Sequence, residues 1–219
     1  MSWFTKALSG TVGRKLLMSL SGLFLISFLV IHLLGNFALM KTEGTAFNEY
    51  ANFMKTNPAI KVLEYVLFGG FILHIVIAVA LTRLNKKARP VGYAYNKPSA
   101  NSSWFSRNMG LTGFLILVFL LIHLKTFFFT HKVPLWEAQA ATLYDEAVVA
   151  FSNPWYVLFY VIAMGFLSFH LIHAFQSAFQ TLGLRHPKYT PFIRVVGVIF
   201  AIIVPALFAL IPVYMYFTH

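Results

Sequence analysis

Residues 154–183 read PWYVLFYVIAMGFLSFHLIHAFQSAFQTLG, and this stretch decides the fold. Roughly 20 apolar residues are enough to cross the hydrocarbon layer of a membrane as a helix. The second half of the stretch nevertheless holds His170 and His173. An imidazole in the bilayer costs free energy unless a partner, a cavity or a metal compensates, so a functional role is the first hypothesis. The alternative is a single histidine that is hydrogen-bonded to a neighbouring helix.

The whole chain has the composition of a helical membrane protein. It is 219 residues long and 59% hydrophobic, which is too apolar for a soluble domain. The sequence therefore predicts an all-α integral membrane protein with one domain over residues 1–219. Five apolar runs are expected to span the membrane, at about 16–40, 58–82, 108–130, 154–182 and 192–217. Asn57-Pro58 and Asn153-Pro154 each place a capping residue before a proline and so predict two helix starts.

The charged residues predict the orientation. Twelve of the seventeen lysines and arginines lie before the first run, in the 83–107 connection, or in the segment from the end of the fourth run to the start of the fifth. All six acidic residues lie in the other connections or near the helix ends beside them. By the positive-inside rule, the N-terminus is cytoplasmic and the C-terminus is outside. Topology thus accounts for the net charge of +11, and nucleic acid is not an expected partner.

Two connections have a character of their own. The basic and turn-rich connection 83–107 could dock a soluble partner, or could set the topology and touch anionic lipid. On the outer side, residues 135–151 place apolar side chains at helical spacing and predict an amphipathic helix in the membrane interface.

The lack of cysteine limits the chemistry. It excludes a disulfide framework, a thiolate-held iron–sulfur cluster and a C-x-x-C-H attachment of haem. Any redox cofactor must therefore be held by other side chains.

Histidines recur in four of the five runs, as His32, His74, His123 and His170. His32 and His123 each lie nine residues before the lysine that ends their run, roughly 13 Å from the outer end. His74 and His170 each lie sixteen residues after the proline that starts theirs, roughly 24 Å from the outer start. The four histidines therefore form two pairs at two depths, about 10 Å apart.

Each pair comes from helices that run in the same direction, which would face each other across the diagonal of a four-helix bundle. Helices one to four are expected to form this bundle, with the fifth helix beside it. A diagonal separation of roughly 12–14 Å suits an iron porphyrin held by one imidazole from each side, whereas zinc would need four ligands at one level. His173 is the less favoured alternative to His170, because only His170 matches the depth of His74. We expect His131, His186 and His219, which lie in connections or at the terminus, to be solvated.

The two halves of the chain resemble each other. Gly22 lies ten residues before His32, and Gly113 lies ten before His123. Gly69 and Gly165 each lie five residues before the next histidine. Glycines at such positions would allow a flat ring or another helix to approach the backbone.

The ordered motifs resemble a known family, the five-helix, two-haem cytochrome b subunits that anchor succinate dehydrogenase or fumarate reductase (succinate:quinone oxidoreductases). The resemblance covers nearly the whole chain. The motifs on which it rests are Ile-His32-Leu-Leu-Gly-Asn, Leu-His74-Ile-Val, Ile-His123-Leu-Lys, and Phe-His170 with Gly183 thirteen residues later.

The resemblance implies two b-type haems. His74 and His170 would bind the haem nearer the cytoplasm, and His32 and His123 the outer haem. It also implies flavoprotein and iron–sulfur partner subunits on the cytoplasmic face, which would carry the FAD and the clusters. The chain would then be an electron-transfer and quinone-reactive subunit in the inner (cytoplasmic) membrane, with no dicarboxylate active site of its own, and the complex could form a higher oligomer.

Two positions depart from the family. Some two-haem members carry a glutamate two residues before the helix-four ligand, where Ser168 stands here. An acidic residue near the outer quinone pocket of some members aligns close to Lys55, so the family's quinone site is not carried over to this chain. Glu43 and Glu49 are weak substitutes for that acid.

Two other functions fit the same sequence. The chain could be a cytochrome b anchor of another dehydrogenase, such as a hydrogenase or a formate dehydrogenase. It could also be a proton-coupled transporter that uses its histidines as a relay. A copurifying dehydrogenase activity separates the first alternative, and the absorption bands of low-spin haem separate the second.

Overall fold

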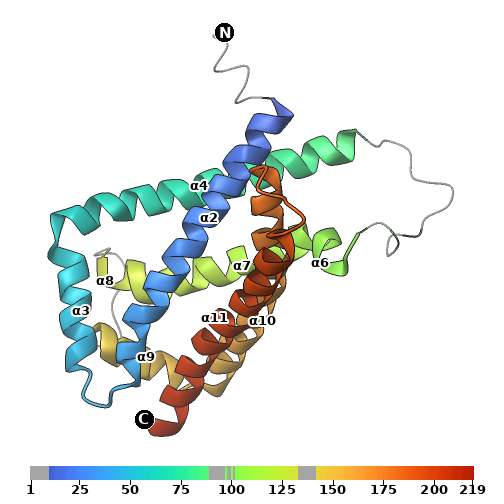
Figure 1. The fold of residues 1–219 in the computed structure, drawn as a ribbon. Helices are drawn as coiled ribbons and strands as arrows, with labels where there is room; N and C mark the ends of the chain where they lie inside the picture. Colours follow the sequence, from blue (N-terminus) through green and yellow to red (C-terminus); the bar gives the residue numbers. More distant parts are fainter. Residues whose placement is uncertain (1–9, 89–96, 98–99, 101, 133–141) are drawn as a thin grey trace.

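The structure is a computed structural model that describes residues 10–88, 97, 100, 102–132 and 142–219. These residues form helices joined by turns, with no strand among them, so the predicted all-α class is confirmed (Figure 1). Five helical stretches are long and apolar enough to cross a membrane: Thr11–Met40, Pro58–Lys87, Met109–Lys132, Pro154–Thr181 and Thr190–Thr218. The chain is therefore a multi-pass membrane protein.

Three of the spans are single α-helices and two change their winding. The single helices are α4 (Pro58–Lys87), α10 (Pro154–Thr181) and α11 (Thr190–Thr218). The first span joins α2 (Thr11–Asn36) to a 3₁₀ turn, η1 (Phe37–Met40). The third span joins α7 (Met109–His123) to a π-helical segment, η2 (Leu124–Phe129), and to α8 (Thr130–Lys132). Shorter helices lie outside the spans: α3 (Thr45–Thr56), α6 (Trp104–Arg107) and α9 (Leu143–Phe151).

The two helix starts that the sequence predicts are confirmed. The side-chain oxygen of Asn57 accepts from the backbone N–H of Ala59, and that of Asn153 accepts from the N–H of Trp155, both at 2.9 Å. The proline that follows each asparagine has no N–H to satisfy at the first helical position, so it fits there at no cost.

Several helices run past the ends of their apolar runs. α2 begins at Thr11 rather than near residue 16, and α4 continues to Lys87 rather than ending near residue 82. The extra turns carry Arg14, Lys15 and Lys86 among others, which an apolar window leaves out. Such residues continue a helix readily, because the long aliphatic part of the side chain packs while its charge reaches polar surroundings.

Packing places α10 at the centre of the described chain. α10 packs against α11, α7 and α2, and α2 packs in turn against α4. The α10–α11 contact is close because Gly197 has no side chain: a Cβ there would lie 2.5 Å from Cδ1 of Phe175. The outer parts of the second and third spans are joined by an ion pair between Lys132 and Glu64 and by the rings of Phe68 and Phe128, 5.0 Å apart.

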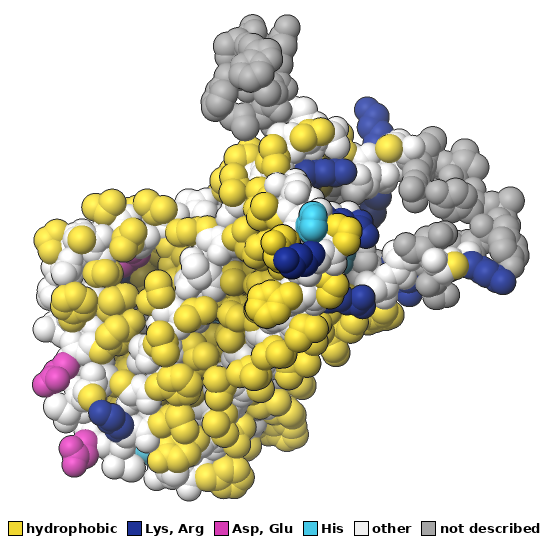
Figure 2. Space-filling view, in the orientation of Figure 1, with side chains coloured by type: hydrophobic (Ala, Val, Ile, Leu, Met, Phe, Trp, Pro, Cys, Tyr) yellow, Lys and Arg dark blue, Asp and Glu magenta, His cyan; other side chains and the backbone are white. Residues whose placement is uncertain are grey.

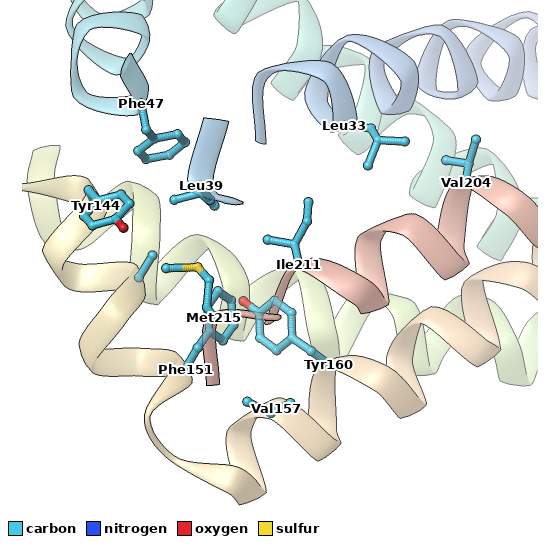
Figure 3. Close-up of a cluster of buried hydrophobic side chains, with 11 residues drawn as sticks. Leu33, Leu39, Phe47, Tyr144, Phe151, Val157, Tyr160, Val204, Ile211 and Met215 are labelled. Atoms are coloured by element: carbon cyan, nitrogen blue, oxygen red, sulfur yellow. The ribbon is translucent and has the colours of Figure 1, made fainter. Parts of the chain in front are cut away.

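The main cluster of buried side chains lies toward the end of the molecule that holds α3, α9 and the C-terminus (Figure 3). Met215 of α11, Phe151 of α9 and Tyr160 of α10 meet in it. The predicted helix near 135–151 is present as α9 in its described part, and residues 133–141 lie outside the described residues. Its apolar face is covered by protein, since Ala147 is 2% and Phe151 4% exposed.

The surface divides along the long direction of the molecule. A broad apolar band covers the middle, lysines and arginines gather toward the end near α6, and the visible acidic side chains lie toward the opposite end (Figure 2). An apolar band between two polar ends is the surface expected of a chain that crosses a bilayer.

Candidate functional site

The structure brings His32 and His123 together. Their ring centroids are 5.8 Å apart with an angle of 88° between the ring planes, although the rings come from α2 and α7, which are not close packing neighbours. An imidazole nitrogen lies about 2.0 Å from a metal that it binds, so two axial rings on one iron would have their centroids roughly 6 Å apart. Ordinary edge-to-face ring pairs have similar separations, so the distance is compatible with haem but does not by itself indicate it.

Aromatic rings surround this outer pair. Phe28 stacks on His32 at 5.1 Å and Phe208 lies 5.7 Å from it. Phe119 stacks on His123 at 5.6 Å, and Phe127 lies at 5.4 Å. The walls around the two imidazoles are therefore aromatic and apolar, which suits the faces of a porphyrin.

The inner pair is held by hydroxyl groups from neighbouring helices. Nδ1 of His74 lies 3.1 Å from Oγ of Ser21 on α2, and Nδ1 of His170 lies 3.3 Å from Oγ1 of Thr112 on α7. The two halves of the chain thus build the same contact twice.

The hydroxyl contacts favour the tautomer of each ring that carries its proton on Nδ1. Ser21 donates its own hydrogen to the carbonyl of Met18, at 3.1 Å. Thr112 donates to the carbonyl of Asn108, at 3.2 Å. Each hydroxyl oxygen is therefore left to accept from an imidazole Nδ1–H, and the lone pair of Nε2 stays free. A hydrogen-bonded Nδ1–H with a free Nε2 is the usual state of a histidine that binds a metal.

The glycines predicted to lie near a flat ring fall into two groups. A Cβ on Gly22 would lie 3.5 Å from the ring of His74, and one on Gly113 would lie 3.6 Å from the ring of His170. These two glycines give the imidazoles room against a helix backbone. A Cβ on Gly69 or Gly165 would meet nothing within 4 Å, so helix packing does not require those two glycines.

The hydroxyl contacts give a second estimate of the separation between the two histidine levels. Ser21 precedes His32 by eleven residues on α2, and Thr112 precedes His123 by eleven on α7, roughly 16 Å along each helix. The expected separation was about 10 Å. The value of about 10 Å was counted from the ends of different helices and assumed that these ends lie at one depth. The value of roughly 16 Å is counted along a single helix, from the residue that contacts one histidine to the other histidine.

The outer histidines have less similar partners. Nδ1 of His123 lies 3.0 Å from the phenol oxygen of Tyr160 on α10. The side-chain nitrogen of Asn36 lies 3.3 Å from Nδ1 of His32 and donates to the backbone carbonyl of the same residue at 2.7 Å. His32 is therefore held from within its own helix. An amide nitrogen can only donate, so this contact makes Nδ1 of His32 the acceptor and favours a proton on Nε2, the opposite of what the hydroxyl contacts favour.

A π-helical segment, which the sequence analysis missed, starts directly after His123. In η2 the helix widens over Leu124–Phe129, and Thr130 donates its hydroxyl to the carbonyl of Lys125, five residues back, at 2.5 Å. π-helical turns are rare and occur frequently at functional sites. The three consecutive phenylalanines in the segment give no sequence signal that separates it from an ordinary helix.

The other histidines differ in their surroundings. His173 lies one turn beyond His170 and interacts with it electrostatically, but the hydroxyl contact belongs to His170. His186 is exposed as expected. The expectation of a solvated His131 is wrong, because its Nε2 is buried, 3.8 Å from the buried carboxylate of Glu146. His219 is exposed, yet its Nε2 lies 2.7 Å from the hydroxyl of Tyr144.

Two surface hollows lie near the outer ends of α2 and α11. The two candidate quinone-site acids, Glu43 and Glu49, line a hollow of about 520 Å³ together with Tyr214. A second hollow of about 360 Å³ is apolar and lies beside His32, lined by Ile31, Leu34, Gly35, Ala38 and Tyr50. Burial raises the pKa of Tyr50, so its phenol stays protonated and is the hydrogen-bond donor of this hollow.

The candidate ligands do not gather in one cluster. Within the described residues, no group of three or more histidine, cysteine, aspartate or glutamate side chains is placed to hold a metal ion. The four histidines therefore do not converge as the ligands of one zinc ion would. Comparisons with protein-family models, curated proteins and solved structures give no match to this chain.

Proposed function

We propose that the chain is a di-haem cytochrome b that anchors a succinate:quinone oxidoreductase in the membrane and transfers electrons between a soluble dehydrogenase and quinone. The observation that carries the proposal is the repeated histidine site. Nδ1 of His74 and Nδ1 of His170 each lie against a hydroxyl, which favours a free Nε2, and the rings of His32 and His123 lie next to each other among aromatic side chains. The ordered histidine motifs are the ones by which the chain resembles the two-haem cytochrome b subunits of succinate:quinone oxidoreductases.

The residues would hold the two cofactors in different ways. His74 and His170 would bind the inner haem, with Ser21 and Thr112 fixing their tautomers. His32 and His123 would bind the outer haem, and Phe28 and Phe119 would keep water from it. When bound, haem iron supplies one-electron redox chemistry, which fits a chain without cysteine or a flavin-binding glycine motif. Dicarboxylate chemistry would then belong to the FAD and iron–sulfur subunits.

Quinone would bind on the outer side. The apolar hollow beside His32 can hold a quinone ring, and the protonated hydroxyl of Tyr50 can donate to a quinone carbonyl. The neighbouring hollow that contains Glu43 and Glu49 offers carboxylates that could accept protons from a quinol.

The partners would dock at the opposite end. Lysines and arginines gather near α6 and the ends of α4 and α10 (Figure 2). Such a surface suits an acidic face of an iron–sulfur subunit. By the positive-inside rule we expect this end to face the cytoplasm. The family resemblance implies that the membrane is the inner (cytoplasmic) membrane.

A spectrum of the purified full chain tests the cofactor. We expect low-spin b-type bands in the reduced-minus-oxidised difference and two haems per polypeptide in the pyridine haemochrome assay. A protein without these bands would favour the transporter alternative.

The electron route is tested in the complex with its soluble subunits. We expect His32→Ala to remove the outer haem and to abolish succinate-dependent reduction of a quinone analogue, while succinate oxidation by a soluble dye continues. Full quinone-linked turnover without the outer haem would contradict the route. Copurification of a hydrogenase or formate dehydrogenase activity instead of succinate oxidation would assign the anchor to that enzyme.

A further inference from the structure

A chain of hydroxyl groups begins at Nδ1 of His123. The phenol oxygen of Tyr160 lies 3.0 Å from this nitrogen and 3.4 Å from the phenol oxygen of Tyr156. Tyr156 donates to Oγ1 of Thr126, at 2.9 Å. Thr126 donates to the backbone carbonyl of Ile122, at 3.1 Å. Four donors thus follow one another from a candidate ligand to a backbone carbonyl.

The last link fixes the direction of all the others. Thr126 uses its hydrogen on the carbonyl of Ile122, so its oxygen accepts from Tyr156. Tyr156 is then left to accept from Tyr160, and Tyr160 to accept from Nδ1–H of His123. The chain of hydroxyls therefore favours the tautomer of His123 in which Nε2 is free to bind a metal.

Burial makes Tyr160 the decisive member. It is 6% exposed and lies in the buried cluster, beside Phe151 (Figure 3). The rings of Phe119 and Phe151 contact its ring edge-on, at 4.9 and 5.1 Å. A phenol in such surroundings cannot turn to water, because its hydroxyl would lose its partners. Thr126, at the far end, lies in the π-helical segment that follows His123.

We propose that Tyr160 is a positioning residue for the outer haem: it holds the His123 ring in the Nδ1–H tautomer and directs Nε2 at the iron. This inference rests on the proposed function. Accepting a hydrogen bond from the free N–H of an axial imidazole makes the ring a stronger electron donor, which stabilises the oxidised metal. The hydroxyls that support the inner pair are short side chains on neighbouring helices, so Tyr160 is a support specific to the outer site.

The test compares Tyr160→Phe, which removes one oxygen atom, with Tyr65→Phe on the exposed surface of α4, where Tyr65 is 75% exposed. In the purified full chain we expect Tyr160→Phe to move the midpoint potential of the outer haem to a more positive value and to change its electron paramagnetic resonance g-values. The inner haem and the Tyr65→Phe control should be unchanged. Retention of the outer haem should fall about 10-fold or more.

A second variant, Tyr156→Phe, breaks the chain one link further out and should move the potential in the same direction by less. If both haems bind and neither variant changes the potential or the g-values of the outer haem, Tyr160 does not position His123 and the inference is overturned. If the wild-type chain binds no haem, the proposed function fails.

The role of Tyr160 can still be tested in that case, by measuring the tautomer of His123 in the haem-free chain. ¹⁵N NMR should give Nδ1–H for His123 in the wild type and a mixture of tautomers in Tyr160→Phe. Identical spectra would contradict the role of Tyr160.

Discussion

A histidine can bind a metal through Nε2 only if that nitrogen does not carry the proton. In this chain the choice is made by side chains that are far from the histidines in sequence. Ser21 and Thr112 each donate to their own helix and can accept from an imidazole, and Tyr160 does the same through two further hydroxyls. Three different side chains thus favour the same tautomer in three of the four candidate ligands.

His170 and His173 lie one turn apart on α10, and the hydroxyl contact distinguishes them. Thr112 and the open space at Gly113 support the ring of His170. We therefore expect His170→Ala to lower the haem content from two to one per chain, and His173→Ala to leave two, as measured by the pyridine haemochrome assay. The two variants are matched in chemistry and helix position. Two haems in the first variant and one in the second would exchange the assignment.

The sequence predicts which histidines are candidates but not what holds them. One histidine in each of four apolar runs is visible from the high cost of burying an ionisable ring. The partners are not visible, because the rotation of each helix about its axis depends on packing. Ser21, Thr112 and Tyr160 are ordinary members of apolar runs until α4, α7 and α10 are placed beside them. Haem ligation itself stays a prediction.

At the scale of elements, α10 and α11 lie close together at Gly197. A Cβ at this position would lie 2.5 Å from Cδ1 of Phe175, whereas a Cβ on Gly110 would meet nothing within 4 Å. We expect Gly197→Ala to destabilise the folded protein by about 1–3 kcal/mol, because the phenyl ring or the helix must shift. Gly110→Ala should be neutral or slightly stabilising, since alanine favours a helix.

Thermal unfolding in detergent, followed by circular dichroism, measures both glycine variants. Equal midpoints for Gly197→Ala and Gly110→Ala would mean that the α10–α11 contact adapts without cost.

Tyr144 ties the outer elements together. Its hydroxyl donates to the carbonyl of Lys41 at 2.9 Å and lies 2.7 Å from Nε2 of His219. Burial, and then the neighbouring Tyr214 and Asp145, raise the pKa of Tyr144. Above pH of about 10 an unfolded tyrosine loses its proton while Tyr144 keeps it, so the contribution of Tyr144 to stability is present below that pH and falls as the pH rises.

We expect Tyr144→Phe to lower stability by about 1 kcal/mol at pH 8, because it removes these hydrogen bonds. The difference between wild type and variant should shrink between pH 8 and 11 in thermal unfolding. Taking the difference in stability between wild type and Tyr144→Phe removes the effect of the other tyrosines and the lysines, because these titrate in both proteins. A difference that grows with pH would contradict the raised pKa.

The helices themselves are largely predictable, and their irregularities are not. Asn-Pro pairs mark the starts of α4 and α10 because capping is a local interaction. The π-helical segment after His123 and the burial of Glu146 beside His131 depend on contacts between distant parts of the chain. An amphipathic helix near 143–151 is visible in the sequence, but whether protein or lipid covers its apolar face is decided by the helices around it.

At the scale of the whole molecule, charge is divided between the two ends of an apolar body. Basic side chains gather at the end near α6, and acids lie toward the end with α3 and α9 (Figure 2). In a cytoplasmic membrane the basic end is expected inside, where it can meet soluble subunits and where anionic lipid attracts it. Orientation therefore decides whether the proposed docking surface and the proposed quinone side are on the correct faces.

The absence of cysteine from the sequence makes the orientation directly measurable, because one introduced cysteine is then a unique label. Ser152 lies exposed between α9 and α10, and Leu184, 54% exposed, follows α10 at the basic end.

We expect a membrane-impermeant maleimide to label Ser152→Cys from outside, in intact cells whose inner membrane is accessible. Leu184→Cys should be labelled only after the membrane is opened. The reverse pattern would place the basic end outside, where no cytoplasmic dehydrogenase could reach it, and would overturn both the topology and the proposed docking surface. Labelling of both positions from outside would mean that the intervening α10 does not span the membrane.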